Sequence, residues 1–144
     1  MTDEIRYDFV DTNVLVYAHD VSAGPRHARA EALVRELWAK RAGCLSVQVL
    51  QELYLVLTRK VRAPLAEDHA AKILAALSSW RVHAPNAADV LEAIEKSRRN
   101  TISFWDAMIV HSAGSLGCSV LWSEDLNAGQ ICEGVKVLNP FHSA

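Results

Sequence analysis

The pattern of apolar and polar positions predicts an amphipathic helix in the first third of the chain. Positions 30, 33, 34, 37 and 38 are apolar and follow the i, i+3, i+4, i+7, i+8 spacing of one helical face. This spacing predicts a helix over residues 27–42, which ends before Gly43. On the same pattern Trp38 is expected to be a core residue.

The helix predicted over residues 47–60 is apolar on two faces rather than one. One face carries Val49, Leu53 and Val56, and the other carries Leu50, Tyr54 and Leu57. A helix with two apolar faces has little surface suited to water. We therefore expect this helix to be largely buried.

The remaining segments alternate between helices and short strands. Further helices are predicted over residues 66–77, from residue 87 to 94, and over 104–117, where the chain is apolar nearly all round. Five short apolar runs predict strands, which are the run that ends at Asp11, CLSV (44–47), WRVHAP (80–85), CSVLW (118–122) and VKVLNP (135–140). Strands that alternate with helices are typical of a parallel sheet covered on both faces.

The expected fold is therefore α/β, a three-layer α/β/α sandwich around a parallel sheet of about five strands. Right-handed crossovers that reverse direction after the third strand give the order 3-2-1-4-5, with strands one and four adjacent at the switch point. The chain has 144 residues, of which 51% are hydrophobic. That length and composition suit a single domain over residues 1–144.

Charge and cysteine content narrow the function only a little. The net charge of −2 argues against nucleic-acid binding by bulk charge alone. Three cysteines without a C-x-x-C pair favour neither a disulfide framework nor a zinc knuckle, so we expect a reducing cytoplasm. The opening residues MTDEIRYD lack the apolar core of a signal peptide, and no apolar run is long enough to span a membrane.

Four acidic residues are expected to converge at the carboxyl ends of strands one and four. Asp11 closes strand one, and Asp125 follows strand four almost at once. Glu52 and Asp106 lie on the two most apolar helices, each with apolar residues on its own helical face. Ligands bind at this crevice in doubly wound sheets.

Structural explanations remain open for three of these acids. Asp11 could cap the short helix that follows it, and Ser103-x-x-Asp106 fits a capping box. Asp125 could serve a loop turn. Glu52 has no such explanation, because a glutamate in mid-helix on an apolar face caps nothing.

Four carboxylates in one crevice would repel one another and raise their own pKa values. A divalent cation removes that repulsion, so the arrangement predicts a metal site. Because no histidine or cysteine joins the set, the oxygen ligands favour a hard ion, Mg²⁺ or Mn²⁺.

These segments resemble the four acidic motifs of PIN-domain ribonucleases, especially VapC-type toxins. The motifs are DTNVLVYA with Asp11, QEL with Glu52, SFWDAMIV with Asp106 and LWSEDLNAG with Asp125. The resemblance covers almost the whole chain in the expected order. It implies metal-dependent endoribonuclease activity, the four acids as catalytic metal ligands, and a small antitoxin as a protein partner. Polar residues that accompany the acids in the family match Thr12, Asn13 and Ser123.

In the implied reaction a metal-activated water cleaves RNA and leaves a 5′-phosphate and a 3′-hydroxyl. No side-chain nucleophile is needed, and the sequence shows neither G-x-S-x-G nor G-x-x-x-x-G-K. The six histidines are scattered and are expected to be structural or solvated: His19, His27, His69, His83, His111 and His142.

Two other functional classes, a phosphatase and a non-catalytic scaffold, share part of this pattern. Haloacid-dehalogenase-like phosphatases need D-x-D-x-T after the first strand, whereas Asn13 stands where the second aspartate should be. A non-catalytic PIN-like scaffold that binds RNA or protein would be expected to lack some of the acids, and none is missing. An Ala- and Leu-rich chain also makes a homodimer plausible.

Three groups of basic residues could contact RNA, but the second and third of them end predicted helices, where cations suit the helix dipole. The groups are Arg26 with Arg29, then Arg59, Lys60 and Arg62, and finally Lys96, Arg98 and Arg99.

Overall fold

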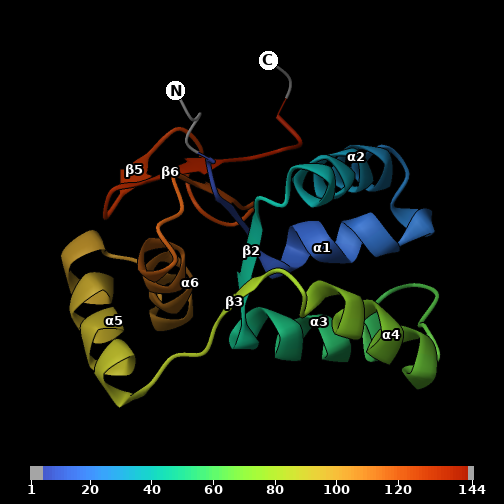
Figure 1. The fold of residues 1–144 in the computed structure, drawn as a ribbon, viewed down its shortest axis with the longest axis horizontal. Helices are drawn as coiled ribbons and strands as arrows, with labels where there is room; N and C mark the ends of the chain where they lie inside the picture. The colour runs from blue at the N-terminus through green and yellow to red at the C-terminus, as the bar shows by residue number, and fades with distance from the viewer. Residues whose placement is uncertain (1–4, 143–144) are drawn as a thin grey trace.

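The protein is built around one twisted sheet of six strands, as shown by a computed structural model that describes residues 5–142 (Figure 1). The strands are β1 (Asp8–Val10), β2 (Gly43–Ser46), β3 (Arg81–His83), β4 (Val120–Trp122), β5 (Ile131–Cys132) and β6 (Val135–Leu138). Their order across the sheet is β3-β2-β1-β4-β6-β5. The first four residues of the MTDEIRYD segment lie outside the described residues.

The sheet confirms the predicted parallel order. Strands β3, β2, β1, β4 and β6 pair in parallel, and β6 is the strand predicted from VKVLNP. The additional strand β5 pairs antiparallel with β6 at the sheet edge. The sequence pattern did not reveal β5, because two residues are too few to show an alternation of apolar and polar positions.

Six α-helices cover the two faces of the sheet. They are α1 (Thr12–His19), α2 (Pro25–Lys40), α3 (Val47–Arg59), α4 (Glu67–Leu77), α5 (Ala87–Asn100) and α6 (Phe104–Ser115), and a short 3₁₀ helix spans Val21–Ala23. In Figure 1, α5 and α6 lie on one side of the sheet and α1 to α4 lie on the other. Within residues 5–142, no helix has the length and apolar character needed to cross a bilayer.

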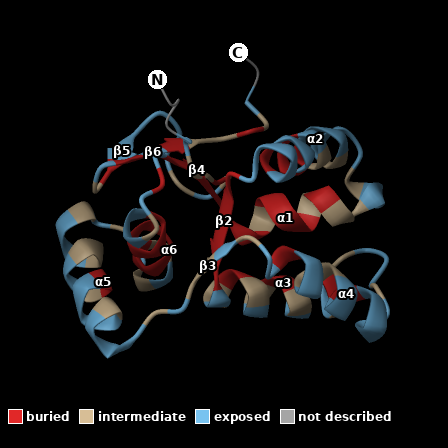
Figure 2. Ribbon diagram, in the orientation of Figure 1, coloured by how far each residue is buried: buried red, intermediate tan, exposed pale blue. Residues whose placement is uncertain are grey.

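The core lies on both sides of β1. Phe9 and Val10 of β1 are fully buried, as are Val14 and Leu15 of α1 (Figure 2). On the opposite side every residue of α6 from Ala107 to Ala113 is buried, as its all-round apolar sequence predicted. Helix α6 therefore forms an inner layer between the sheet and α5.

Trp38 is not a core residue, and this prediction was wrong. Its side chain is 39% exposed, whereas Leu33, Val34 and Leu37 of the same helix are buried. Helix α2 ends at Lys40, so Trp38 lies in its last turn. The indole instead packs edge-to-face on Trp80, with 5.3 Å between the ring centroids.

Helix α3 is only half buried, so the expectation of a largely buried helix was also wrong. Val49, Leu53 and Leu57 are fully buried, but Val47 and Leu55 are exposed. The helix packs against α1, α4 and β2 with one face. The second predicted face is partly covered, because Leu57 is fully buried and Leu50 packs against the core, whereas the exposed Val47 and Leu55 lie on neither predicted face.

Candidate functional site

The candidate site lies where the chain reverses direction across the sheet. Strands β1 and β4 are parallel neighbours, and the N–H of Asp11 donates to the carbonyl oxygen of Trp122 at 3.0 Å. The residues that follow the two strands therefore meet at one edge of the sheet. In doubly wound folds this edge, at the carboxyl ends of the strands, is where ligands bind.

Asp11 is buried at the base of this crevice. It caps α1, where its carboxylate accepts from the Thr12 N–H at 2.7 Å, and it also accepts from the Ser123 hydroxyl at 3.0 Å. The pKa of Asp11 is raised to about 7, chiefly by burial and also by the charges of Asp125 and Glu52, whereas the hydrogen bonds from Thr12 and Ser123 act to lower it. The carboxylate thus serves the helix cap and faces two other acids.

Glu52 reaches the same crevice from α3. Its carboxylate accepts from the Thr12 hydroxyl at 2.7 Å and from the Gln48 side-chain amide at 3.0 Å. Sequence reasoning missed Gln48, although a glutamine four residues before Glu52 shares its helical face. The Gln48 amide also lies 3.5 Å from the carbonyl oxygen of Trp105, so it links α3 to the first turn of α6.

Asp125 and Asp106 complete the acidic group. Asp125 accepts from the Asn13 side-chain amide at 2.7 Å, and its own N–H donates to the Ser123 hydroxyl. Burial raises the pKa of Asp125, and the charges of Asp106, Glu124 and Glu52 raise it further. Asp125 therefore lies within electrostatic reach of Asp106 and Glu52, although no three of the four acids form a ligand group within 4.8 Å among the described residues.

Asp106 also has a local structural role. Its N–H donates at 3.1 Å to the hydroxyl of Ser103, which caps α6. The carboxylate of Asp106 lines a cavity of about 250 Å³ together with Asp125. The capping interpretation and the site interpretation of this segment are therefore compatible.

The three polar residues expected to support the acids each bind one of them. Thr12 binds Glu52, Asn13 binds Asp125, and Ser123 binds Asp11. Each bond joins side chains from different elements or loops, so the contacts also tie α1 to α3 and to the loop after β4. Hydrogen bonds of this kind hold carboxylates in fixed orientations.

No side-chain cation within residues 5–142 forms an ion pair with the four acids. The neighbouring Glu124, by contrast, pairs with Arg26 at 2.7 Å and accepts from the Tyr17 hydroxyl. The repulsion among the four carboxylates therefore has no internal compensation. Their oxygens are a donor set that suits Mg²⁺ or Mn²⁺.

Several basic residues proposed for RNA contact have structural partners instead. Arg29 donates to the Pro140 carbonyl oxygen, and Arg99 forms a two-bond pair with Glu133. Hydrogen bonds from Arg99 and Asn100 lower the pKa of Glu133 to about 2. These contacts agree with a structural role at helix ends.

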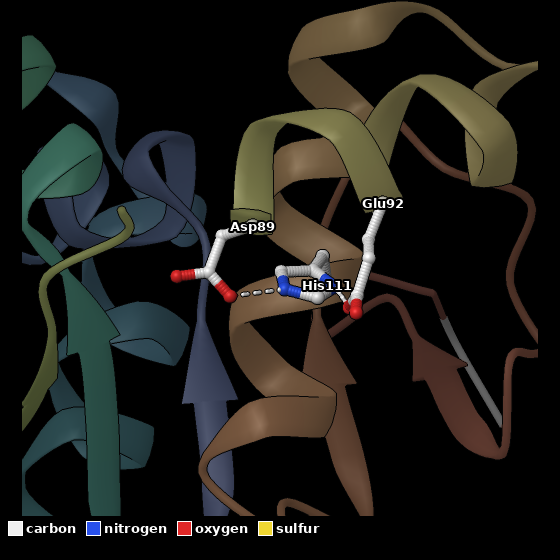
Figure 3. Close-up of side chains that lie close together, drawn as sticks. All are labelled: Asp89, Glu92 and His111. Atoms are coloured by element: carbon white, nitrogen blue, oxygen red, sulfur yellow. Dashed lines mark hydrogen bonds and ion pairs between the residues drawn. The ribbon is translucent and has the colours of Figure 1, made fainter. Parts of the chain in front are cut away.

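A second polar cluster joins α5 to α6, on the other side of the sheet from α3 (Figure 3). Asp89 and Glu92 on α5 and the buried His111 on α6 each place a ligand-type atom within 4.8 Å of the others. No pattern in the sequence predicted this group, because only helix packing brings His111 to the two acids. Spacing along the chain alone does not show that contact.

Hydrogen bonds satisfy this second cluster without an ion. The Lys96 ammonium contacts Nδ1 of His111 at 2.9 Å, and Nε2 contacts Asp89 at 2.7 Å. Since an ammonium can only donate, Nδ1 of His111 accepts a hydrogen bond from Lys96. Nε2 therefore carries the hydrogen and donates a hydrogen bond to Asp89. Lys96 therefore places a positive charge beside His111 in this cluster.

Comparisons with known proteins agree with this geometry. The family model of the PIN domain matches residues 9–133. No curated protein matches the sequence significantly. Among solved structures, VapC20 of Mycobacterium tuberculosis, a toxin that cleaves the sarcin-ricin loop, is 25% identical with a TM-score of 0.61, over 82% of this chain and 89% of that chain.

Two further solved structures share the fold at lower identity. A toxin-antitoxin complex from Klebsiella pneumoniae is 16% identical, with a TM-score of 0.66 over 94% of this chain and 99% of that chain. DNA-bound VapBC from Salmonella typhimurium is 19% identical, with a TM-score of 0.63 over 94% and 99%. The family match spans most of the chain and includes all four acids. The chain therefore belongs to the PIN domain family.

Proposed function

We propose that this protein is a metal-dependent endoribonuclease and the toxin component of a toxin-antitoxin pair. The observation that carries the proposal is the convergence of Asp11, Glu52, Asp106 and Asp125 beyond the ends of β1 and β4, without a cationic partner. Such a group is costly unless divalent cations bind to it. The four acids would hold Mg²⁺ or Mn²⁺.

The residues of the chain prepare this site for phosphodiester hydrolysis. When bound, the metal would hold a phosphate oxygen and lower the pKa of an attacking water molecule. Thr12, Asn13 and Ser123 orient the carboxylates through hydrogen bonds of 2.7 to 3.0 Å. Because Asp11 is buried and hydrogen-bonded twice, its orientation is set before any ligand arrives.

The similarity to VapC20, a toxin that cleaves an RNA loop, supports RNA as the substrate class. The similar toxin-antitoxin complexes support an antitoxin as the protein partner. A toxin that acts on cellular RNA would work in the cytoplasm. A second copy of the chain is a further expected partner.

Cleavage of single-stranded RNA by the purified chain tests the enzyme. We expect cleavage with Mg²⁺ or Mn²⁺, no cleavage in EDTA, and no requirement for zinc. Asp106→Asn should lower the rate at least about a hundredfold, whereas the exposed matched control Asp68→Asn should keep it. Undiminished cleavage in EDTA would exclude the metal mechanism.

Expression in bacteria tests the toxin role. The chain expressed alone should arrest growth, and co-expression of the antitoxin encoded beside it should restore growth. Asp106→Asn should relieve the arrest while the protein remains folded, as circular dichroism would verify. Growth arrest by the folded Asp106→Asn variant would instead favour a non-catalytic PIN-like scaffold that acts by binding.

A further inference from the structure

A small cavity adjoins two of the four acids and is also lined by polar residues outside the acidic group. It has a volume of about 250 Å³ and is bounded by the first turn of α6, the loop after β4 and the β5–β6 hairpin. Its polar residues include Asp106 and Asp125 of the acidic group, and also Asn127 and Gln130. A space of this volume holds about eight water molecules and is therefore large enough for one nucleobase.

The side-chain amides of Asn127 and Gln130 line this cavity from exposed positions. Within residues 5–142, neither amide makes a hydrogen bond to the protein, so both can bind a ligand without breaking an internal contact. Each amide carries donors and an acceptor side by side. Such groups recognise the edge of a base by paired hydrogen bonds.

The backbone that carries the two amides is held firmly. The Gly129 N–H donates to the Val137 carbonyl oxygen at 2.7 Å, and the Val137 N–H donates to the Gln130 carbonyl oxygen at 2.9 Å. These bonds anchor the loop to β6 on either side of Gln130. The amides are therefore presented from a fixed backbone, which lowers the entropy lost when a ligand binds.

Apolar residues supply a further part of the lining, beside Thr101, Ser103 and Cys132. Ile102, Leu126 and Val137 border the cavity, and all three belong to or pack against the main hydrophobic core. A flat base needs such a surface for its faces and polar groups for its edge. The cavity offers both.

We propose that this cavity receives one unpaired nucleobase of the RNA and that Asn127 and Gln130 read its edge. Because the cavity shares Asp106 and Asp125 with the acidic group, the base belongs to a nucleotide that flanks the scissile phosphodiester. Asn127 and Gln130 are then determinants of sequence specificity rather than of catalysis. This inference rests on the proposed ribonuclease function.

The test compares wild type with the double variant Asn127→Ala/Gln130→Ala. Substrates are short single-stranded RNAs in which each nucleotide that flanks the cleavage site carries one of the four bases or no base. For wild type, kcat/KM should vary about ten- to a hundredfold with the base at one flanking position. In the double variant this variation should fall below about threefold, while the RNA that lacks that base is cleaved equally by both proteins.

The matched control is Gln51→Ala, which removes an exposed amide on α3, on the other side of the sheet from the cavity. It should keep the base preference of wild type. Thermal melts of all variants verify that they are folded. If RNA is cleaved but the base preference survives in the double variant, the cavity inference is wrong and the nuclease proposal stands.

A binding measurement tests the cavity inference in the case that wild type cleaves no RNA. The same RNAs, labelled for fluorescence anisotropy, are titrated into Glu52→Gln protein with and without the two alanine substitutions. In that case wild type cleaves no RNA, while the base-dependent affinity of Glu52→Gln disappears with the two alanine substitutions. That pair of results would support the cavity inference and reject the nuclease proposal. Affinity that is independent of the base in both proteins would reject the cavity inference.

Discussion

At the scale of single residues, Glu52 is the acid at which a metal-ligand role and a structural role predict different results. Its two hydrogen-bond donors, Thr12 and Gln48, are both neutral. A glutamate held in place for structure would be expected to pair with a cation, and Arg59 and Lys60 at the end of the same helix were the candidates. Neither contacts it in the described residues, so its charge adds to the repulsion from Asp11 and Asp125.

Removal of that charge should therefore not destabilise the metal-free protein. We expect Glu52→Gln in EDTA to melt at the same temperature as wild type or higher, because one repelling charge is gone. Stabilisation by Mg²⁺ should shrink, since a ligand is lost. Thermal melts of both proteins with and without Mg²⁺ measure the two effects.

The control for this experiment is Glu95→Gln, which removes an exposed acid on α5. It should alter neither the metal-free melting temperature nor the response to Mg²⁺. A loss of about 3 to 5 kcal/mol in metal-free Glu52→Gln, with an unchanged metal response, would indicate a buried ion pair instead.

The raised pKa of Asp11 predicts a particular dependence of stability on pH. Because the folded protein holds this proton up to about pH 7 and the unfolded chain releases it near pH 4, the folded state binds more protons in between. The free energy of unfolding in EDTA should therefore fall as pH rises from about 4 to 7. The free energy of unfolding lost through Asp11 is at most about 4 kcal/mol, and no more is lost above the pKa of the folded state.

Denaturant unfolding at a series of pH values in EDTA measures this effect. Asp11→Asn, which keeps a good helix cap, should lose the Asp11 part of the slope. Metal affinity should rise with pH over the same interval in wild type, because the ligand must lose its proton to bind the ion. Identical pH profiles for the two proteins would show that Asp11 is ionised throughout.

At the scale of elements, the contact between α5 and α6 determines where one of the four acids lies. Helix α6 carries Asp106 in its first turn, and His111 on the same helix connects to Asp89 and Lys96 of α5. Hydrogen bonds from the Asn86 N–H and from His111 lower the pKa of Asp89, so this acid is held in its ionised form. The cluster ties the inner helix to the outer one.

Substitution of His111 should weaken this helix pair. His111→Ala leaves Asp89 and the partly buried Lys96 without their shared partner, so we expect a loss of about 1 to 3 kcal/mol in the free energy of unfolding. Glu92→Gln should have little effect, since its side chain is 65% exposed. Urea unfolding of the two variants measures the difference.

Zinc provides an independent measurement on the same cluster. Because Lys96 already occupies Nδ1 of His111, we expect no zinc-induced rise in melting temperature that depends on Glu92. A zinc-induced rise in wild type that disappears in Glu92→Gln would show that this cluster is a metal site.

At the scale of the whole molecule, the uncovered face of α3 is an expected contact surface between two copies of the chain. Val47, Leu50, Tyr54 and Leu55 of α3 and Leu74 of α4 line a largely apolar cavity of about 480 Å³. Contiguous exposed apolar surface of this kind marks protein interaction sites. A partner that covers it would bury the exposed Val47 and Leu55.

We expect the isolated chain to dimerise through this surface and Leu55→Asp to shift it to the monomer. Leu55 is 42% exposed, so the fold should tolerate the change, whereas a buried charge would disrupt the interface. Leu91→Asp, on the other side of the sheet, is the matched control at an exposed leucine. Sedimentation velocity over a range of concentrations would reject the expectation if Leu55→Asp still dimerised.

The sequence by itself determined the succession of elements and the adjacency of β1 and β4. Helical spacing and short apolar runs depend on neighbours along the chain, so they located α2, α3, α6 and the parallel strands. Right-handed crossovers then placed β1 beside β4, which brings Asp11 to Asp125. Glu52 stood out because no local structural role explained it.

Only the tertiary structure decided which apolar surfaces are covered and which polar groups meet across helices. Periodicity places Trp38 on an apolar face, but burial requires a second element over that face, and none covers it fully. Likewise, His111 meets Asp89, and Asn127 and Gln130 border the cavity beside Asp106, only through packing of distant segments. These contacts depend on how elements pack in three dimensions, which the spacing of residues along one element does not contain.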